Sequence, residues 1–422
     1  MKYIITCQFL LLSIFSLSQP LVEVKPESAG MSSERLKRID ALLQEYIDKQ
    51  YIAGGTAIII KDGKIVYHKA IGYDERAGKA PLKRDAIFRI ASQTKAITSV
   101  AVMMLYEEGK LMLDDPLGKY IPEYTNQVVL DKFNAVDTTY TTVKANRQVT
   151  IRDLLTHTSG IGYAQIGSPE SNAIYYKYGV VGGIGVGRIY LADKMKILGG
   201  LPLLHQPGEK WTYGLNTDLL GYLVEVVSGM DLATFLKKKI FDPLGMKDTY
   251  FYLPAAKHSR LVSLYTEDSL KHAIKAAESF NINGEVLADY PLTEGTYYSG
   301  GGGLSSTALD YGIFLQMLLN KGRYNGKRIL SPASVRMMTS EQYRMPWGDN
   351  VMGLGFGVYT EKSAARKPPS AGSYEWGGMF SSSYWADPEE KIAGQLFLNQ
   401  FPNSHGEIHD KFKVLVYAAI NE

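Results

Sequence analysis

Residues 56–68 read TAIIIKDGKIVYH, two β-rich runs on either side of Asp62-Gly63. Aspartate and glycine both tolerate the positive φ angles of a two-residue turn, so this stretch predicts a β-hairpin. A second hairpin is predicted near the other end of the chain, where Tyr384-Trp385 and residues 392–398 flank Asp387-Pro388. Neither hairpin has enough strands to be stable alone, so we expect both to belong to one antiparallel sheet.

Helical patterns surround and separate the two hairpins. Apolar residues between Leu36 and Ile47 follow a serine cap and have the spacing of one buried helix face. Further helices are expected near residues 308–320 and 408–420. The predicted fold is α/β (α+β), an antiparallel sheet flanked by helices. Residues 19–90 and 295–422 build the sheet domain, and residues 91–294 form an inserted, mainly helical domain with a cleft between the two.

The composition is that of an ordinary globular protein. Of 422 residues, 45% are apolar and 21% are charged, enough for one large domain and a second one. The net charge is only +3, and the cationic residues are scattered among acidic ones. This charge distribution predicts no basic surface, so we do not expect nucleic acid to be a partner. No residue pattern points to a particular oligomeric state.

The first residues have the pattern of a secretory signal peptide. Lys2 precedes an apolar stretch from Ile4 to Leu17, which ends in small residues before Gln19. A membrane anchor is the alternative, but the stretch is shorter than the roughly 20 residues of a comfortable span. We therefore expect residues 1–18 to be removed from a periplasmic or secreted protein with no stable membrane span. Since Cys7 is the only cysteine, the mature chain would have no thiol.

A candidate nucleophile lies in Ser92-Gln93-Thr94-Lys95, where serine and lysine stand three residues apart. On a helix these two side chains share one face and can touch. A serine hydroxyl becomes nucleophilic when a neighbouring base takes its proton, and a partly buried lysine can be that base. The alternative is a capped helix with a solvated lysine. The position of Ser92 at the junction of the sheet and the helical region favours the nucleophile.

Two further groups could complete such a site. Tyr213 ends the loop PGEKWTY at 207–213, where a phenol beside a lysine can relay protons, unless it only packs. Trp376-Gly377-Gly378-Met379 is expected on a strand whose glycines let a ligand approach the backbone, or in a β-bulge. His157 is interpreted as structural, and the tyrosine- and glycine-rich residues 161–190 as a substrate-facing loop.

Competing chemistries find little support in the sequence. It contains no Gly-x-Ser-x-Gly elbow, no His-Glu-x-x-His metal motif and no Gly-x-x-x-x-Gly-Lys phosphate loop. The glycines from Gly182 to Gly187 do not complete a dinucleotide-binding pattern. We therefore expect no metal and no cofactor.

The three groups, in this order and at these separations, resemble the serine β-lactamase and penicillin-binding-protein superfamily. The resemblance is to the class C β-lactamase-like branch, which includes the family VIII carboxylesterases, and it covers nearly the whole mature chain. Residues 149–160, 241–246 and 300–307 are similar to the same branch. The resemblance implies that Ser92 is acylated, that Lys95 is its base partner, and that Tyr213 opens the second motif. The N–H groups of Ser92 and Met379 would form the oxyanion hole.

Two departures from the family pattern bear on the substrate. Leu215 stands where the family's β-lactamases have the asparagine of Tyr-x-Asn, and Asn216 is one residue late. Trp376-Gly377-Gly378 stands where many members have Lys-Thr-Gly, which removes a cation that would meet a substrate carboxylate. Both changes resemble the esterases of the branch.

The expected function is hydrolysis of a small-molecule ester or amide substrate, most simply an ester with a small or medium acyl group, through an acyl-enzyme. One alternative is a β-lactamase or a D-alanyl peptidase that acts on cell-wall peptides. Another is a non-catalytic ligand-binding protein on the same fold, although binding alone requires no activated nucleophile.

Overall fold

The computed structural model describes residues 20–281, 285–346 and 348–421. The predicted signal peptide and Cys7 lie outside these residues. The largest sheet among the described residues is antiparallel and nine-stranded, in the order β14-β15-β16-β17-β18-β19-β1-β2-β3. Its strands are β1 (Gly54–Lys61), β2 (Lys64–Asp74), β3 (Ala80–Pro81), β14 (Tyr343–Arg344), β15 (Val351–Met352), β16 (Gly357–Val358), β17 (Tyr374–Gly378), β18 (Ser382–Asp387) and β19 (Ile392–Phe397).

Both predicted hairpins are present, and they lie side by side in this sheet. β1 pairs with β19 from Thr56 opposite Phe397 to Lys61 opposite Ile392. The turn between β1 and β2 contains Asp62-Gly63, with φ angles of 51° and 72°, as a tight hairpin turn requires. The prediction of one sheet shared by the two ends of the chain is confirmed.

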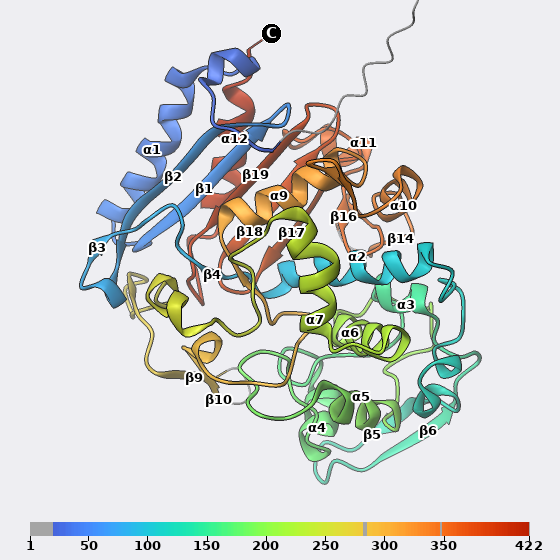
Figure 1. The fold of residues 1–422 in the computed structure, drawn as a ribbon. Helices are drawn as coiled ribbons and strands as arrows, with labels where there is room; N and C mark the ends of the chain where they lie inside the picture. Colours follow the sequence, from blue (N-terminus) through green and yellow to red (C-terminus); the bar gives the residue numbers. More distant parts are fainter. Residues whose placement is uncertain (1–19, 282–284, 347, 422) are drawn as a thin grey trace, which may run out of the picture.

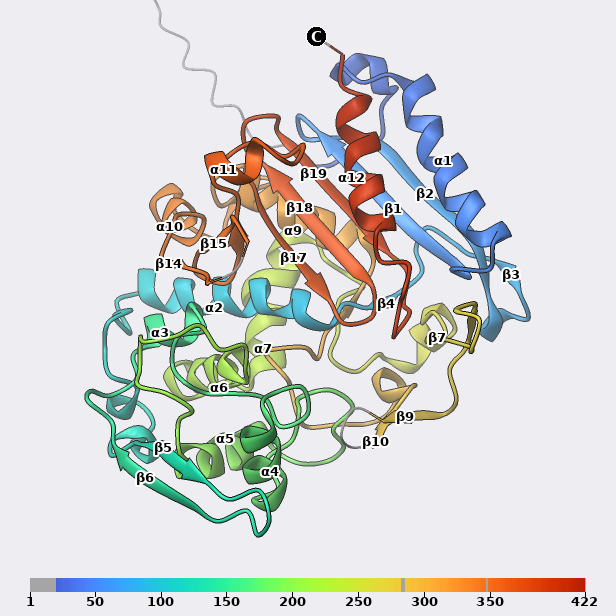
Figure 2. The ribbon, with the colours of Figure 1, turned by 180° about the vertical axis from the view of Figure 1, so that it is seen from behind.

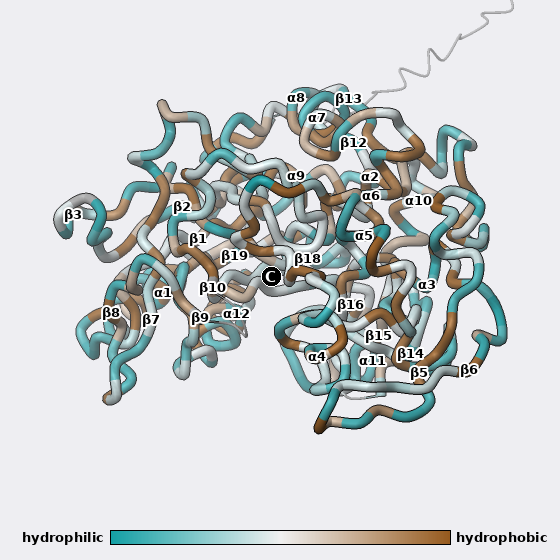
Figure 3. Tube along the Cα trace, turned by 90° about the horizontal axis from the view of Figure 1, so that it is seen from below, coloured by the Kyte–Doolittle hydropathy of each residue, from teal (hydrophilic) through white to brown (hydrophobic). Residues whose placement is uncertain are grey.

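Helices cover both faces of the sheet. α1 (Ser33–Asp48) and α12 (Ile408–Ala418) pack on one face, and α9 (Ala308–Leu319) packs on the other (Figures 1 and 2). Side chains alternate between these layers along β1, because successive residues of a strand point to opposite faces. Ile59 belongs to the hydrophobic cluster beneath α1 and α12, whereas Ile58 and Ile60 belong to the cluster beneath α9. Figure 3 shows hydrophobic stretches on the central strands and also on the helices of the segment beside them.

The segment between the two parts of the sheet contains helices and three small hairpins. Its helices are α2 (Thr94–Glu107), α3 (Ile151–Leu155), α4 (Pro169–Lys177), α5 (Leu191–Gly199), α6 (Asn216–Ser228), α7 (Leu232–Leu236) and α8 (Asp242–Leu244). The hairpins, which the sequence analysis did not anticipate, are β5 (Val128–Phe133) with β6 (Tyr140–Lys144), β7 (Tyr265–Glu267) with β8 (Ala273–Lys275), and β9 (Ser279–Asn281) with β10 (Glu285–Leu287). One hydrophobic cluster extends from the sheet through these helices, so the two regions share a continuous core.

Short elements connect this core to the sheet. β4 (Phe88–Arg89) pairs with β11 (Ser305–Ser306), and the remaining elements are β12 (Arg323–Tyr324), β13 (Lys327–Arg328), α10 (Pro332–Met338) and α11 (Glu361–Ala364). Within the ranges that the structure describes, no single helix has both the length and the apolar composition of a membrane span. The bent pair of α6 and residues 232–244 reaches both only when its two arms are counted together.

Candidate active site

Ser92 lies in a short turn over Ala91–Gln93 that leads into α2, and Figure 1 shows α2 between the sheet and the helical segment. Ala91 has a φ of 43°, a strained conformation for a residue with a Cβ atom. Lys95 is in the first turn of α2 and is only 2% exposed. Its Nζ lies 3.3 Å from Ser92 Oγ. The structure therefore brings the serine and the lysine of the motif into contact.

Tyr213 reaches the same serine from the loop before α6. Its hydroxyl lies 2.7 Å from Ser92 Oγ, and Lys95 Nζ lies 4.7 Å from the centre of its ring. Four aromatic side chains pack around this ring: His157, Tyr163, Trp211 and Trp376. The phenol is thus held by packing beside both Ser92 and Lys95.

Lys95 donates hydrogen bonds to three oxygens, the number of N–H groups that an ammonium carries. They are Ser92 Oγ at 3.3 Å, Tyr163 Oη at 2.9 Å and the Gly301 carbonyl at 2.6 Å. Sequence reasoning missed the last two partners. Tyr163 is one of 29 tyrosines and was suggested only by its place in the loop 161–190. Gly301 acts through a backbone atom, which no residue type encodes.

Ser92 opens on a small pocket of about 40 Å³. The predicted substrate-facing loop forms much of its wall, through Tyr163, Gln165, Ile166, Gly182 and Ile184. A larger groove of about 720 Å³ adjoins it, because Ile166 borders both spaces and Tyr213 borders the groove. The small compartment beside Ser92 and the wide groove therefore share a wall at Ile166.

The end of β17 packs closely on the segment before Ser92. A Cβ atom at Gly378 would lie 2.3 Å from the Ile90 carbonyl oxygen, so glycine is required for this approach. Met379 follows and lines the same pocket as Ser92. The two residues whose N–H groups are the expected oxyanion hole thus border one space. Trp376 and Gly377, on β17, border a neighbouring cavity of about 370 Å³ instead.

Leu215 and Asn216 both point into the protein. Leu215 is fully buried in the core and lines neither the small pocket nor the groove. Asn216 accepts a hydrogen bond from Ser159 Oγ, and its Nδ2 lies 3.0 Å from His157 Nδ1. The part of the second motif that presents an amide to substrate in the family's β-lactamases therefore presents none here.

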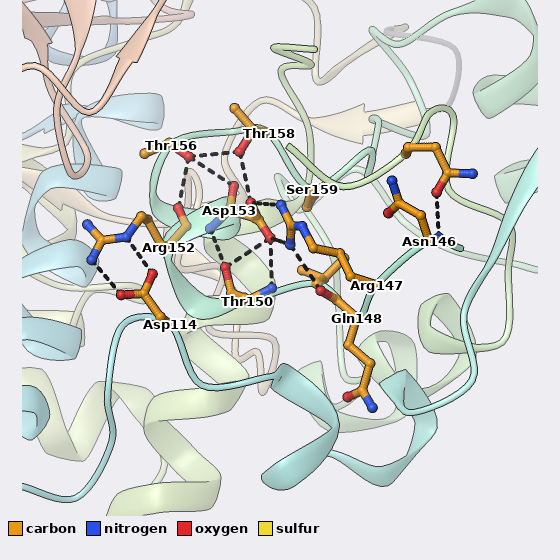
Figure 4. A network of polar contacts seen from close by, with 12 residues as sticks. Asp114, Asn146, Arg147, Gln148, Thr150, Arg152, Asp153, Thr156, Thr158 and Ser159 are labelled. Carbon is orange, nitrogen blue, oxygen red and sulfur yellow. Dashed lines mark hydrogen bonds and ion pairs between the residues drawn. The ribbon is translucent and has the colours of Figure 1, made fainter. Parts of the chain in front are cut away.

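Asp153 anchors the segment that carries His157 and Ser159 (Figure 4). It accepts two hydrogen bonds from Arg147, at 2.6 and 2.9 Å. With Thr150 it forms the capping box of α3, and it also accepts from Thr158 Oγ1 at 3.3 Å. The His157 ring, fixed in this way, packs 5.0 Å from the Tyr213 ring. His157 thus helps to hold the Tyr213 ring in position by packing against it.

Burial changes the proton affinity of the groups around Ser92. Burial, and then the charge of Lys95, lower the pKa of His157 far below its usual value, which leaves a neutral imidazole. Burial raises the pKa of Tyr163, which keeps this hydroxyl protonated. Asp218, a residue of α6 that sequence reasoning missed, lines the pocket. Burial raises the pKa of Asp218 to about 6, against the opposing effects of the nearby Ser299 hydroxyl and of Lys95.

The family model for β-lactamase matches residues 39–419. The chain belongs to the β-lactamase family. Protein Rv1367c of Mycobacterium tuberculosis is 34% identical to it, over 86% of this chain and 90% of that protein. Esterase EstB of Burkholderia gladioli is 28% identical, over 90% of this chain and 95% of that esterase. The solved structure of EstCE1, a hydrolase with promiscuous acyltransferase activity, has a TM-score of 0.77 and 27% identity, and covers 91% of this chain and 99% of its own.

Membership of the β-lactamase family confirms the resemblance drawn from the three motifs. The fold expected of this β-lactamase-family protein, an antiparallel sheet with flanking helices, is confirmed as well. Its relatives place it among serine hydrolases of the β-lactamase fold, which include an esterase.

Proposed function

We propose that this protein hydrolyses esters of small or medium acyl groups through an acyl-enzyme on Ser92. The observation that carries the proposal is the convergence of Tyr213 Oη and Lys95 Nζ on Ser92 Oγ, at 2.7 and 3.3 Å. In the structure both groups donate to Ser92 Oγ, and either of them, once deprotonated, is at the distance from which it can take the serine proton, as acyl transfer requires.

Acylation begins when Ser92 Oγ attacks the ester carbonyl carbon and its proton passes to Tyr213. This transfer requires Tyr213 as the phenolate, and the Lys95 Nζ lies 4.7 Å from the centre of its ring, where a cation favours negative charge on the phenol. The N–H groups of Ser92 and Met379 receive the negative charge on the carbonyl oxygen. The bond to the alcohol oxygen breaks as the alcohol takes the proton from Tyr213. Water then attacks the acyl-enzyme with Tyr213 as base, and the acid leaves as Ser92 regains its proton.

Several features of the cleft favour an ester over a β-lactam or a cell-wall peptide. Many family members have a lysine that binds a substrate carboxylate at the position of Trp376. In this chain Trp376 supplies an aromatic surface there instead. Asn216 is engaged by Ser159 and His157, so its amide is not offered to a substrate. The compartment beside Ser92 is small, whereas the adjoining groove has room for the alcohol portion.

The test is hydrolysis of p-nitrophenyl acetate and butyrate beside nitrocefin, with the mass of the protein followed during turnover. Wild-type protein should release p-nitrophenol with an initial burst and gain one acyl mass. Ser92→Ala should do neither. Ser383→Ala is the matched control, because Ser383 lies in the neighbouring cavity behind Trp376, and this variant should keep its activity.

The outcomes separate the competing functions. Nitrocefin turnover without ester turnover would identify a β-lactamase or a peptidase and overturn the esterase proposal. A wild-type protein that neither turns over an ester nor gains an acyl mass would exclude the nucleophile, and a ligand-binding protein would remain.

A further inference from the structure

A carboxylate with an unused oxygen faces the Ser92 pocket. Asp218, in the first turn of α6, is 1% exposed and lines the pocket together with Ser92 and Met379. Among the described residues, no hydrogen bond within 3.5 Å reaches Asp218 Oδ1 or Ser299 Oγ, although the Ser299 hydroxyl lies near enough to lower the pKa of this carboxyl. Leaving a buried carboxylate oxygen without a hydrogen bond is unfavourable. A ligand that donates a hydrogen bond to Asp218 Oδ1 would remove this cost.

The catalytic residues do not meet this need. A Cβ atom at Gly301 would lie 2.5 Å from Asp218 Oδ2 and 3.5 Å from Lys95 Nζ, so the carboxylate and the ammonium face the same side of this glycine. Yet Lys95 already donates to Ser92, Tyr163 and the Gly301 carbonyl. It has no N–H group left for Asp218. Asp218 is also the one charged side chain among the residues that line the pocket.

Glycines keep the space beside this carboxylate open. A Cβ atom at Gly183 would lie 3.2 and 3.3 Å from the two Asp218 oxygens and 3.0 Å from Ser299 Oγ. Gly183 also has a φ of 88°, which disfavours any other residue. The pocket volume of about 40 Å³ corresponds to roughly three water-sized probes. The space therefore suits a chain of two or three heavy atoms.

We propose that Asp218 and Ser299 recognise a hydrogen-bond donor, a hydroxyl or an ammonium, on a short acyl chain of the ester substrate. The inference rests on the proposed esterase function and names its substrate class, 2-hydroxyacyl or 2-aminoacyl esters. A hydroxyl donates to Asp218 Oδ1 and accepts from Ser299 Oγ, whereas an ammonium donates to both. The acyl carbonyl then lies at Ser92, and the alcohol portion occupies the wider groove.

Three phenyl esters of equal length test this recognition: the propionate, the glycolate and the glycinate, which end in a methyl, a hydroxyl and an ammonium. After correction for their rates of hydroxide-catalysed hydrolysis, kcat/KM for the glycolate or the glycinate should exceed that for the propionate at least about tenfold. The better of the two identifies the donor as neutral or charged. A wild-type protein with no preference over the propionate would overturn the inference.

Asp218→Asn keeps the shape of the side chain and removes its charge. We expect this substitution to lower the preference for the donor-bearing ester about tenfold or more. Asp310→Asn is the matched control, since Asp310 is also a buried aspartate but binds Thr249 and the Asp248 N–H outside the pocket. It should leave the preference unchanged. An Asp218→Asn variant that slows all three esters equally would show a structural role and overturn the inference. Should Asp218→Asn fail to fold, Ser299→Ala must lower the preference.

A binding measurement separates this inference from the proposed function. Ser92→Ala cannot be acylated, so calorimetry with this variant reports recognition of the intact esters whether or not the wild type hydrolyses them. Tighter binding of the glycolate or the glycinate than of the propionate supports the inference. Equal binding of all three esters overturns it, even if ester turnover itself is established.

Discussion

Replacing Tyr213 with phenylalanine removes the oxygen nearest to Ser92 and leaves the ring in place. Tyr213 Oη lies 2.7 Å from Ser92 Oγ, whereas its ring stacks on Trp211 at 5.7 Å. Phenylalanine keeps that stacking, so the variant should fold. What it loses is the group that, in the proposed mechanism, accepts the serine proton in acylation and returns it to the leaving alcohol.

The expected loss of activity is large because the proton transfer occurs in the transition state. A positioned general base contributes about 100- to 10,000-fold in rate, equivalent to about 3 to 5 kcal/mol. Tyr163→Phe is the matched comparison. Tyr163 Oη accepts a hydrogen bond from Lys95 Nζ at 2.9 Å. Because this bond is present both before and during the reaction, its loss in Tyr163→Phe should lower kcat less than about tenfold.

Stopped-flow hydrolysis of p-nitrophenyl butyrate measures both variants. The rate constant of the burst reports acylation, and the steady rate reports deacylation. Tyr213→Phe should slow both phases, because the same oxygen serves both steps. If Tyr163→Phe proved far slower than Tyr213→Phe, the proton acceptor would be Lys95, held in place by Tyr163, and the role assigned to Tyr213 would be refuted.

Three further predictions concern the surroundings of the site. Because the folded Asp218 carboxyl, with its pKa raised from 3.8 to about 6, binds its proton more tightly than in the unfolded chain, the free energy of unfolding should fall as the pH rises through this range. Asp218→Asn lacks this titration. The free energy of unfolding of the variant minus that of the wild type, measured with urea, should therefore increase by up to about 3 kcal/mol between pH 4 and pH 8, and a difference that does not change with pH would contradict this. Asp153→Ala should cost about 2 to 4 kcal/mol, because it removes the α3 cap and both bonds from Arg147. Asp114→Ala, which removes a 73% exposed partner, should cost under about 1 kcal/mol, and equal losses would refute the assigned role of Asp153. Trp376→Lys should raise the ratio of p-nitrophenyl hemisuccinate turnover to p-nitrophenyl butyrate turnover several-fold, because the new ammonium can bind the free carboxylate of the hemisuccinate. An unchanged ratio would mean that the bound substrate does not bring its carboxylate to β17.

The sheet could be predicted because its signals are local. Asp62-Gly63 specifies its turn through backbone angles that few residues adopt, and the requirement that a sheet have several strands joins the two hairpins. Ser92 and Lys95 could be found for the same reason, since three residues on a helix fix the distance between side chains. The Asp62-Gly63 turn and the Ser92–Lys95 contact lie within a few residues of the patterns that predict them, whereas the pairing of the two hairpins follows from the general stability of sheets.

The rest of the site depends on contacts between distant segments. Tyr163 acts by reaching Lys95, which lies 68 residues earlier in the chain, and no local pattern separates it from the other tyrosines. Asp218 has the spacing of an ordinary helical residue. The role that we propose for it depends on its burial beside Gly183 and Gly301, which only the folded chain shows. The direction of Leu215, into the core, likewise follows from packing around α6.

The pairing of β1 with β19 joins two strands separated by more than 300 residues along the chain. Closing so long a loop costs chain entropy before any contact compensates for it. Until the C-terminal strands have emerged from the ribosome, the edge of β1 that pairs with β19 is unpaired. The finished fold brings the two ends together, because Ser32 N–H bonds the Ala419 carbonyl at 2.8 Å. A short linker between Ser32 and Ala419 would make a circularly permuted form of this protein feasible, with new termini at the exposed turn 134–139.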